Sequence, residues 1–362
     1  MAELELANKP DAGQALERVE AWWDGALIDR ACVQVTAPRR PDRPPPSVAH
    51  KTLRDRWMDA EYSVDLADHY IGSTYYGGEI LPSYFPNLGP EVLSTAYGAE
   101  LQFGPETSWS EPFLTDWSQV EALRFDADNV YVRTILDMTR ISLEKGRGRF
   151  LTGITDLHPG GDLAASFRDP QQLCLDLVES PQQVHSLLDK VWSSFFDFYE
   201  LQHSLLRQAG QTITTSWLPL FCEGRYYIPS NDFSCMVSPA MFREFFLDEL
   251  IAETEWLDRS IYHLDGPGAI RHLDAILEMP RLGAVQWVYG SGNEPASKWI
   301  PLLERILKAG KNVHIAIDAA ELDTFMANLP PERVMLQMSV ATPEDADDVV
   351  RRVARWTAKG RY

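Results

Sequence analysis

The chain of 362 residues has few cysteines and a deficit of basic side chains. Its four cysteines contain no CxxC pair, so the sequence predicts neither a thiolate zinc knuckle nor a disulfide framework. Lys and Arg number 33 against 53 Asp and Glu, which gives a formal net charge of −20. Because phosphate binding requires clustered basic side chains, we expect no nucleic-acid partner and no attraction to an anionic membrane.

Long apolar runs are also missing. No stretch approaches the roughly 20 apolar residues that a transmembrane helix needs. The first residues, MAELELANKPDAGQ, are acidic and polar and lack the basic and apolar pattern of a secretory signal. Apolar residues nevertheless make up 45% of the chain, enough for a large core. We therefore expect a soluble, cytoplasmic protein that makes no membrane contact.

Short apolar segments alternate with amphipathic ones after about residue 130. RFLTGITDLH, SIYHLDG, GAVQWVYGSG and NVHIAID are typical of buried strands, and amphipathic helical segments lie between them. Such alternation favours a parallel sheet with helical crossovers. We predict one (β/α)8 TIM barrel over residues 1–362, with an N-terminal extension and a lid-like insertion within residues 1–125. Long loops rich in aromatics, Gly and Pro would cover its C-terminal face.

Two of the predicted strand ends carry a His and an Asp two residues apart. His263 and Asp265 end one strand, and Asp156 and His158 end another. Side chains at i and i+2 share one face of a strand, so each pair is expected to point into the barrel mouth. Active sites of such barrels lie at this end of the strands. We therefore assign these four residues, with Asp232, as catalytic candidates.

Further polar and aromatic residues near predicted strand ends or in the lid-like segment are candidate substrate-binding residues. A single polar residue at a strand end more often caps the next helix, but several that converge are costly to bury without partners. The charged run Glu249–Glu255, by contrast, is interpreted as a solvated helix face. The substrate-binding candidates are Tyr75, Tyr76, Glu79, Trp217, Glu223, Arg225, Gln286 and Trp287.

Several longer blocks carry a family resemblance. They include AWWDGALIDR, YYGGEILPSYFPNLGPE, DLHPGGDLAASFRDPQQLCLDLVESP, NDFSCMVSPAMFREFF and YHLDGPGAIRHLDAILEMPRLGAVQWVYGSGN. Over nearly its whole length the chain resembles the uroporphyrinogen decarboxylase superfamily, in particular the branch labelled "trimethylamine corrinoid protein 2"-like. Corrinoid and thiol methyltransferases and cobalamin-independent methionine synthase are related to that superfamily. The resemblance implies a (β/α)8 barrel with its site at the carboxyl ends of the strands.

The resemblance also implies a candidate metal site. The zinc-dependent methyltransferases of the superfamily use a His-x-Cys motif and a later Cys, so that zinc activates a thiol. His263 falls on the histidine of that motif, but Asp265 stands where the cysteine would be. His263 and Asp265 are therefore predicted ligands of a divalent metal such as Zn, Mn, Fe or Mg. A metal-free site, with the two residues as a base and its orienting partner, remains open.

Three functions remain open. The leading hypothesis is methyl transfer on a small methylated substrate, assisted by a metal or by a corrinoid carried on a partner protein. The second is a lyase or hydrolase of a sugar- or polyol-like substrate, in which carboxylates such as Asp162 act as acid or base. The third is a small-molecule binding protein without catalysis. Decarboxylation of uroporphyrinogen itself is not expected, and a homodimer is left open.

Overall fold

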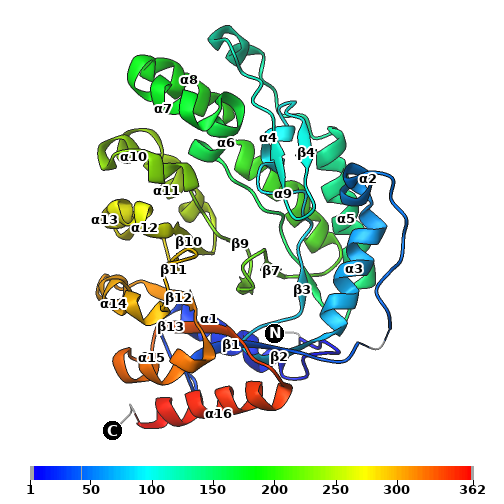
Figure 1. Ribbon diagram of the computed structural model, residues 1–362, viewed down its shortest axis with the longest axis vertical. Helices are drawn as coiled ribbons and strands as arrows, with labels where there is room; N and C mark the ends of the chain where they lie inside the picture. Colours follow the sequence, from blue (N-terminus) through cyan, green and yellow to red (C-terminus); the bar gives the residue numbers. More distant parts are fainter. Residues whose placement is uncertain (1–3, 42, 360–362) are drawn as a thin grey trace.

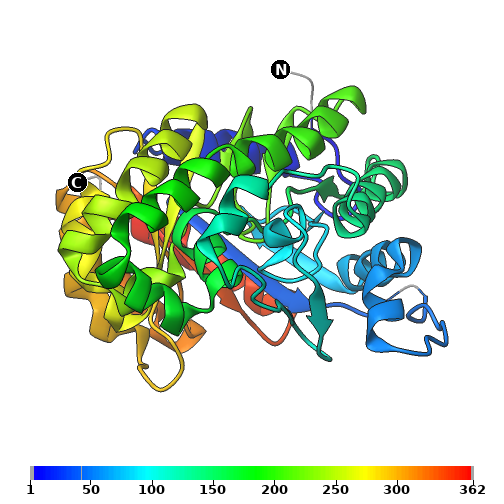
Figure 2. The same ribbon diagram turned by 90° about the horizontal axis from the view of Figure 1, so that it is seen from above.

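The computed structural model describes residues 4–41 and 43–359, and its largest sheet has seven strands in the order β2-β1-β13-β12-β11-β10-β9 (Figures 1 and 2). Each pair of neighbours is parallel except β1 and β2, which are antiparallel. The sheet curls into part of a barrel wall. Its strands are β1 (Cys32–Pro38), β2 (Thr74–Gly78), β9 (Tyr226–Tyr227), β10 (Arg259–Asp265), β11 (Ala284–Val288), β12 (Asn312–Ala316) and β13 (Val334–Ser339).

The remaining strands form three separate two-stranded sheets. Single hydrogen bonds, such as the one from the Ile154 amide to the Thr215 carbonyl at 2.9 Å, connect segments that are otherwise unpaired. The three pairs are β3 (Ser83–Tyr84) with β6 (Leu151–Thr152), β4 (Leu101–Phe103) with β5 (Ser108–Ser110), and β7 (Ile213–Thr215) with β8 (Phe221–Glu223).

The prediction of a (β/α)8 barrel is therefore wrong, because the ladder of parallel strands covers only part of a barrel. On the other side β3 and β6 are two residues long, and β7 pairs with an antiparallel neighbour rather than a parallel one. Pro82 and Pro219 stand next to these short strands, and proline has no N–H to donate to a ladder. Helix and strand alternation in the sequence did not reveal this loss of pairing.

Helices cover the outside of the curled sheet (Figure 1). Apolar residues that alternate along β10 to β13, such as Tyr262, Leu264, Val285 and Ile315, pack in one core with the helices. The helices of this part are α10 (Pro239–Phe245), α11 (Leu247–Trp256), α12 (Gly266–Ala269), α13 (Leu273–Leu277), α14 (Ile300–Lys308), α15 (Leu322–Asn328) and α16 (Pro343–Lys359). Short 3₁₀ turns accompany them at η2 (Asp232–Met236), η3 (Ile270–His272), η4 (Ala296–Trp299) and η5 (Ala319–Glu321).

The other side of the molecule is helical where the sheet is weakest. Helices α3, α5 and α9 pack around β3 and β6 (Figure 1). The helices here are α2 (Leu53–Met58), α3 (Ala60–Gly72), α4 (Val92–Thr95), α5 (Val130–Lys145), α6 (Gly160–Arg168), α7 (Pro170–Glu179), α8 (Pro181–Val191) and α9 (Ser194–Gln208), with the 3₁₀ turn η1 (Trp117–Ala122).

Helix α1 (Ala12–Trp23) covers the amino ends of the strands. Trp22 and Trp23 are buried there, and the indole N–H of Trp23 donates to the Phe221 carbonyl at 3.0 Å. The carboxyl ends of the parallel strands open on the opposite side. Among the described residues, no helix is both long and apolar enough to cross a bilayer.

Candidate functional site

Three segments that follow parallel strands bring the site together. The residues after β6 contribute Asp156 and His158, those after β9 contribute Asp232, and the end of β10 contributes His263 and Asp265. An isolated parallel bridge between Ser230 and His263 extends the pairing of β9 and β10 to this point. The site therefore lies at the carboxyl ends of the strands, although the barrel is not closed.

His263 is held on the inner face of the sheet by two neighbours. Its Nδ1 lies 2.7 Å from Oε1 of Gln286, the residue opposite it on β11. Because an amide oxygen only accepts, His263 donates through Nδ1 in this bond, and its Nε2 is the nitrogen left for another partner. The ring of Trp217 stands perpendicular to the imidazole at 5.2 Å. Sequence reasoning had assigned Gln286 and Trp217 to the site, and both lie there.

A row of polar side chains continues across this inner face. Gln286 faces His314 on β12, and His314 Nε2 lies 3.3 Å from Oε1 of Gln34 on β1. Burial lowers the pKa of His314 to about 3, so this imidazole is neutral. His314 and Gln34 were not predicted as site residues, although their alternation with apolar neighbours carries the same signal as that of His263.

Asp156 and His158 also lie together, but the prediction that they end a strand is wrong, because β6 stops at Thr152. His158 Nε2 is 3.2 Å from Asp156 Oδ1, and its Nδ1 is 3.5 Å from Asp162 Oδ2. Burial alone would lower the pKa of His158, but the Asp156 and Asp162 carboxylates raise it well above its usual value. Without another cation, this imidazole is therefore protonated at neutral pH.

Asp162 links the two sides of the site. Its carboxylate accepts hydrogen bonds from the backbone N–H groups of Asp232 at 3.0 Å and Phe233 at 2.7 Å. This fixes the first turn of η2 and sets Asp232 between His158 and His263. Crowding by protein atoms and the Asp162 charge raise the pKa of Asp232 to about 6, against the lowering effect of the two histidines.

Side chains, rather than a strand ladder, fasten the segment that carries Asp156 and His158. The Leu157 N–H donates to the Tyr227 hydroxyl, which in turn donates to the Thr155 carbonyl at 3.0 Å. The Thr155 N–H donates to Oε1 of Gln202 at 2.9 Å. This segment is thereby tied to β9 and α9, which limits how far His158 can move.

A buried pair of carboxyl groups lies behind His158 and Asp162. Glu249 and Glu253 on α11 are only 5% and 1% exposed, so the interpretation of this run as a solvated face is wrong for both. Burial raises the pKa of Glu249 to about 8, and burial together with the Glu249 charge raises that of Glu253 well above its usual value. The i, i+4 spacing could have indicated a shared helix face, but not that this face is buried.

Two groups of side chains could hold a metal ion. One consists of Asp232, His263 and Asp265, and the other of His158, Asp162 and Asp232. In each group one ligand atom per residue lies within 4.8 Å of the others. A pocket of about 230 Å³ opens beside the second group and is lined by Pro90, Glu91, His158, Asp162, Ala165, Pro170, Asp232, Phe233 and Met236.

Two predicted substrate-binding residues are buried away from this mouth. Glu79 is fully buried, with both carboxylate oxygens paired to Arg30 at 2.7 and 2.5 Å. Trp287 points to the outer face of β11, where its ring packs against Trp299 at 4.9 Å. Since successive residues of a strand face opposite ways, Gln286 takes the inner position and Trp287 joins the core.

Of four more predicted residues, three lie elsewhere and one, Tyr76, lies on the inner face of the sheet. The Tyr75 hydroxyl donates to Asp347 of α16 at 2.5 Å, and its neighbour Tyr76 packs against the main core. Glu223 and Arg225 stand before β9, at the amino end of the parallel strands. The Arg225 guanidinium lies 4.4 Å from the Trp256 ring centre. The structure therefore places Tyr75, Glu223 and Arg225 away from the mouth, whereas Tyr76 pairs with Thr36 and lies on the same inner face as Gln34.

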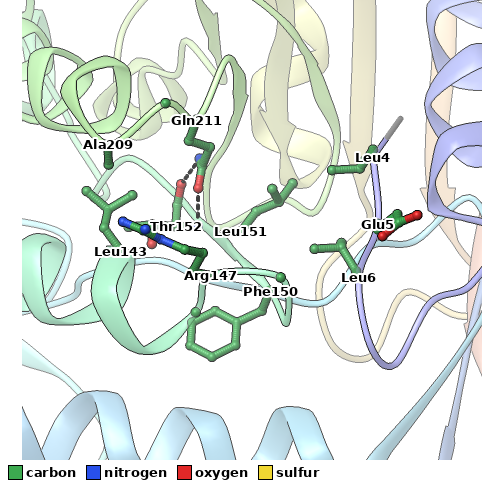
Figure 3. A pocket seen from close by; sticks show the side chains of 13 residues that line it. Leu4, Glu5, Leu6, Leu143, Arg147, Phe150, Leu151, Thr152, Ala209 and Gln211 are labelled. Carbon is green, nitrogen blue, oxygen red and sulfur yellow. Dashed lines mark hydrogen bonds between the residues drawn. The ribbon is translucent and has the colours of Figure 1, made fainter. Parts of the chain in front are cut away.

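A separate pocket of about 170 Å³ lies near the amino ends of β6 and β7 (Figure 3). Gln211 spans it, accepting from the Thr152 N–H at 3.0 Å and donating to the Thr152 carbonyl at 2.7 Å. Its lining is mainly aliphatic, with Glu5 and Arg147 as the charged members. It contains no histidine or cysteine and shares no residue with the two candidate metal groups.

Comparison with known proteins adds no family to these observations. No protein-family model matches the chain, and a search of curated proteins finds no match.

Proposed function

We propose that this chain is an enzyme that binds a divalent metal ion through Asp232, His263 and Asp265 and acts on a small polar substrate. The observation that carries the proposal is the convergence of these three ligand atoms within 4.8 Å at the carboxyl ends of β9 and β10. Bonds of about 2.0–2.2 Å to Zn or Mg place two donors at most about 4.4 Å apart, so these side chains need little movement to close on one ion.

The donor set fits a hard or borderline cation. Two carboxylates and one imidazole suit Zn, Mn, Fe or Mg better than a soft metal that prefers thiolates. Gln286 acts as the partner that orients a metal-binding histidine, because its oxygen holds the Nδ1 proton of His263. A bound divalent ion would supply Lewis-acid polarisation of a substrate oxygen or a water of lowered pKa.

Hydrolysis or elimination on a sugar- or polyol-like substrate is the reaction class that this donor set favours. Trp217 stands beside His263 and offers an aromatic surface to a sugar ring. The cysteine closest to Asp232 in the sequence is Cys235, and burial together with the carboxylates of Asp232, Asp162 and Asp265 raises the pKa of its thiol. A thiol in that setting stays protonated, which disfavours thiolate chemistry.

Methyl transfer in the manner of uroporphyrinogen decarboxylase relatives is the competing proposal, and it rests on the sequence resemblance. It would require a methyl acceptor, such as a corrinoid on a partner protein, to reach the same mouth. Formation of methylcobalamin from cob(I)alamin and a methylated substrate would support it. Release of free sugar from a panel of methyl glycosides would instead support hydrolysis.

Metal content measured by mass spectrometry tests the proposal. Protein purified without a His tag or chelator should carry a divalent metal that His263→Ala loses, with at least about a hundredfold weaker binding on titration. His185→Ala is the matched control, since His185 is a half-buried residue of α8 that stacks on Phe245 and belongs to neither group of candidate metal ligands.

The absence of metal from the wild-type protein, even after incubation with Zn²⁺ and Mn²⁺, would overturn the metal proposal. Equal metal content in the wild type and His263→Ala would also overturn it. His263 and Asp265 would then be interpreted as an acid–base pair or as substrate-binding groups.

A further inference from the structure

We propose that the site holds a second divalent metal ion, bound by His158, Asp162 and Asp232, with Asp232 as the ligand shared by both ions. This inference rests on the proposed function, since it adds a position to the metal site at His263. Its ligand atoms, like those of the first group, all lie within 4.8 Å of one another. Asp232 belongs to both groups, as a carboxylate with two oxygens can.

The contacts of His158 are those of a metal-binding histidine. Its Nε2 lies 3.2 Å from the Asp156 carboxylate, and its Nδ1 faces Asp162 at 3.5 Å. Histidine ligands commonly donate one ring N–H to a carboxylate and present the other nitrogen to the metal. Asp156 is therefore a positioning residue for His158, through an ion-pair contact where Gln286 makes a hydrogen bond to His263.

The charge of the cluster also favours two cations. Among residues 4–41 and 43–359, no lysine or arginine forms an ion pair with any of its four carboxylates. Two divalent ions would balance four carboxylates when both imidazoles are neutral. The carboxylates are those of Asp156, Asp162, Asp232 and Asp265.

The ligands of the second metal position are also held by more hydrogen bonds than those of the first. Asp162 is anchored by two backbone N–H groups of η2, and the segment of His158 is tied to Tyr227 and Gln202. The pocket of about 230 Å³ opens directly beside His158, Asp162 and Asp232. A paired site of this kind suits a substrate that presents two oxygens at its reacting centre, such as an ester.

The test is loading of the metal-free protein with Mn²⁺, followed by metal counting and electron paramagnetic resonance. The wild type should bind two Mn²⁺ per chain and show the spectrum of a spin-coupled pair. His158→Ala and His263→Ala should each bind one and lose the coupled spectrum. Asp156→Asn, a milder change, should weaken one Mn²⁺ about 10- to 100-fold and leave the other unchanged.

The outcomes separate this inference from the proposed function. One Mn²⁺ in the wild type, lost in His263→Ala but retained in His158→Ala, would overturn the second position and leave the first intact. No Mn²⁺ in the wild type would overturn both. Two ions that persist unchanged in His158→Ala and Asp156→Asn, with melting curves that show folded protein, would place the second ion elsewhere and overturn the inference.

Discussion

The strands from β10 to β13 and the strands β3, β6 and β7 are held together in different ways. In the first region a continuous parallel ladder joins neighbours that are five to seven residues long. In the second, strands of two or three residues depend on side chains that bond to the backbone of the next segment. The region of β3, β6 and β7 and the segments that follow them is called the irregular region below. The candidate site uses both regions, because His263 belongs to the ladder and His158 to the irregular region.

This difference shows how a site can stay ordered where the sheet fails. Gln211, Gln202, Ser216 and Tyr227 each bond to a backbone group that a longer strand would have satisfied. Buried backbone groups need such partners, and a side chain can supply them at any spacing. The irregular region can therefore follow the shape of the pocket more freely than the ladder can.

The largest effect that we expect comes from the ladder region. Trp287→Ala should lower the free energy of unfolding by about 3–5 kcal/mol, since it removes a fully buried ring that packs on Trp299. Metal affinity should hardly change, because the side chain points away from the mouth. Urea unfolding and Mn²⁺ titration check the two parts.

Trp217→Ala is the matched variant on the inner face. It should cost less stability, because Trp217 is only partly buried, and should reduce substrate binding instead. If Trp287→Ala weakened metal or substrate binding while Trp217→Ala did not, the assignment of the two tryptophans would be reversed.

A smaller effect, with the opposite sign, is expected at α11, which lies under the irregular region. The folded protein keeps a proton on Glu249 up to about pH 8, whereas the unfolded chain releases it near its ordinary pKa of 4.5. The contribution of Glu249 to the free energy of unfolding is therefore lost as the pH rises from about 4.5 to about 8. Glu249→Gln should remove this loss and raise the free energy of unfolding at pH 8 by about 2 kcal/mol.

Thermal melts of both proteins from pH 5 to pH 8 measure this difference. The gain should grow with pH and should be small at pH 5. Glu255→Gln, an exposed position on the same helix, should show no such trend. A gain that stays constant over the whole range would mean that Glu249 has the same pKa in the folded and the unfolded protein.

The smallest effect concerns a single tether. Gln211→Ala removes three bonds to the backbone of Thr152 and Ile213 and should cost about 1 kcal/mol, because water can reach part of the gap. Amide hydrogen exchange should rise at β6 and β7 but not at β11 and β12. An equal rise in hydrogen exchange in all four strands would show that Gln211 does not stabilise the irregular region independently of the ladder.

The candidate site was predictable where polar residues end long strands. The spacing of His263 and Asp265 placed that pair on one face of β10, whereas Asp156 and His158 lie together in a segment after β6 that is not a strand. The same reasoning misassigned Trp287, since the register of β11 decides which of two neighbours faces inward. It also missed Glu249 and Glu253, because charged side chains are rarely buried and the start of α6 at Gly160, which packs against Glu249, is distant in the sequence.

The sequence by itself determined the alternation of strands and helices and the two close pairs of His and Asp, because both are local patterns of spacing. Only the tertiary structure decided that the parallel ladder stops after β9, and that Asp232 stands between two histidines from different strands. Those features depend on contacts between segments that are distant in the chain, such as Asp162 with the Asp232 amide. No local pattern encodes such contacts, since the partners meet only after the chain has folded.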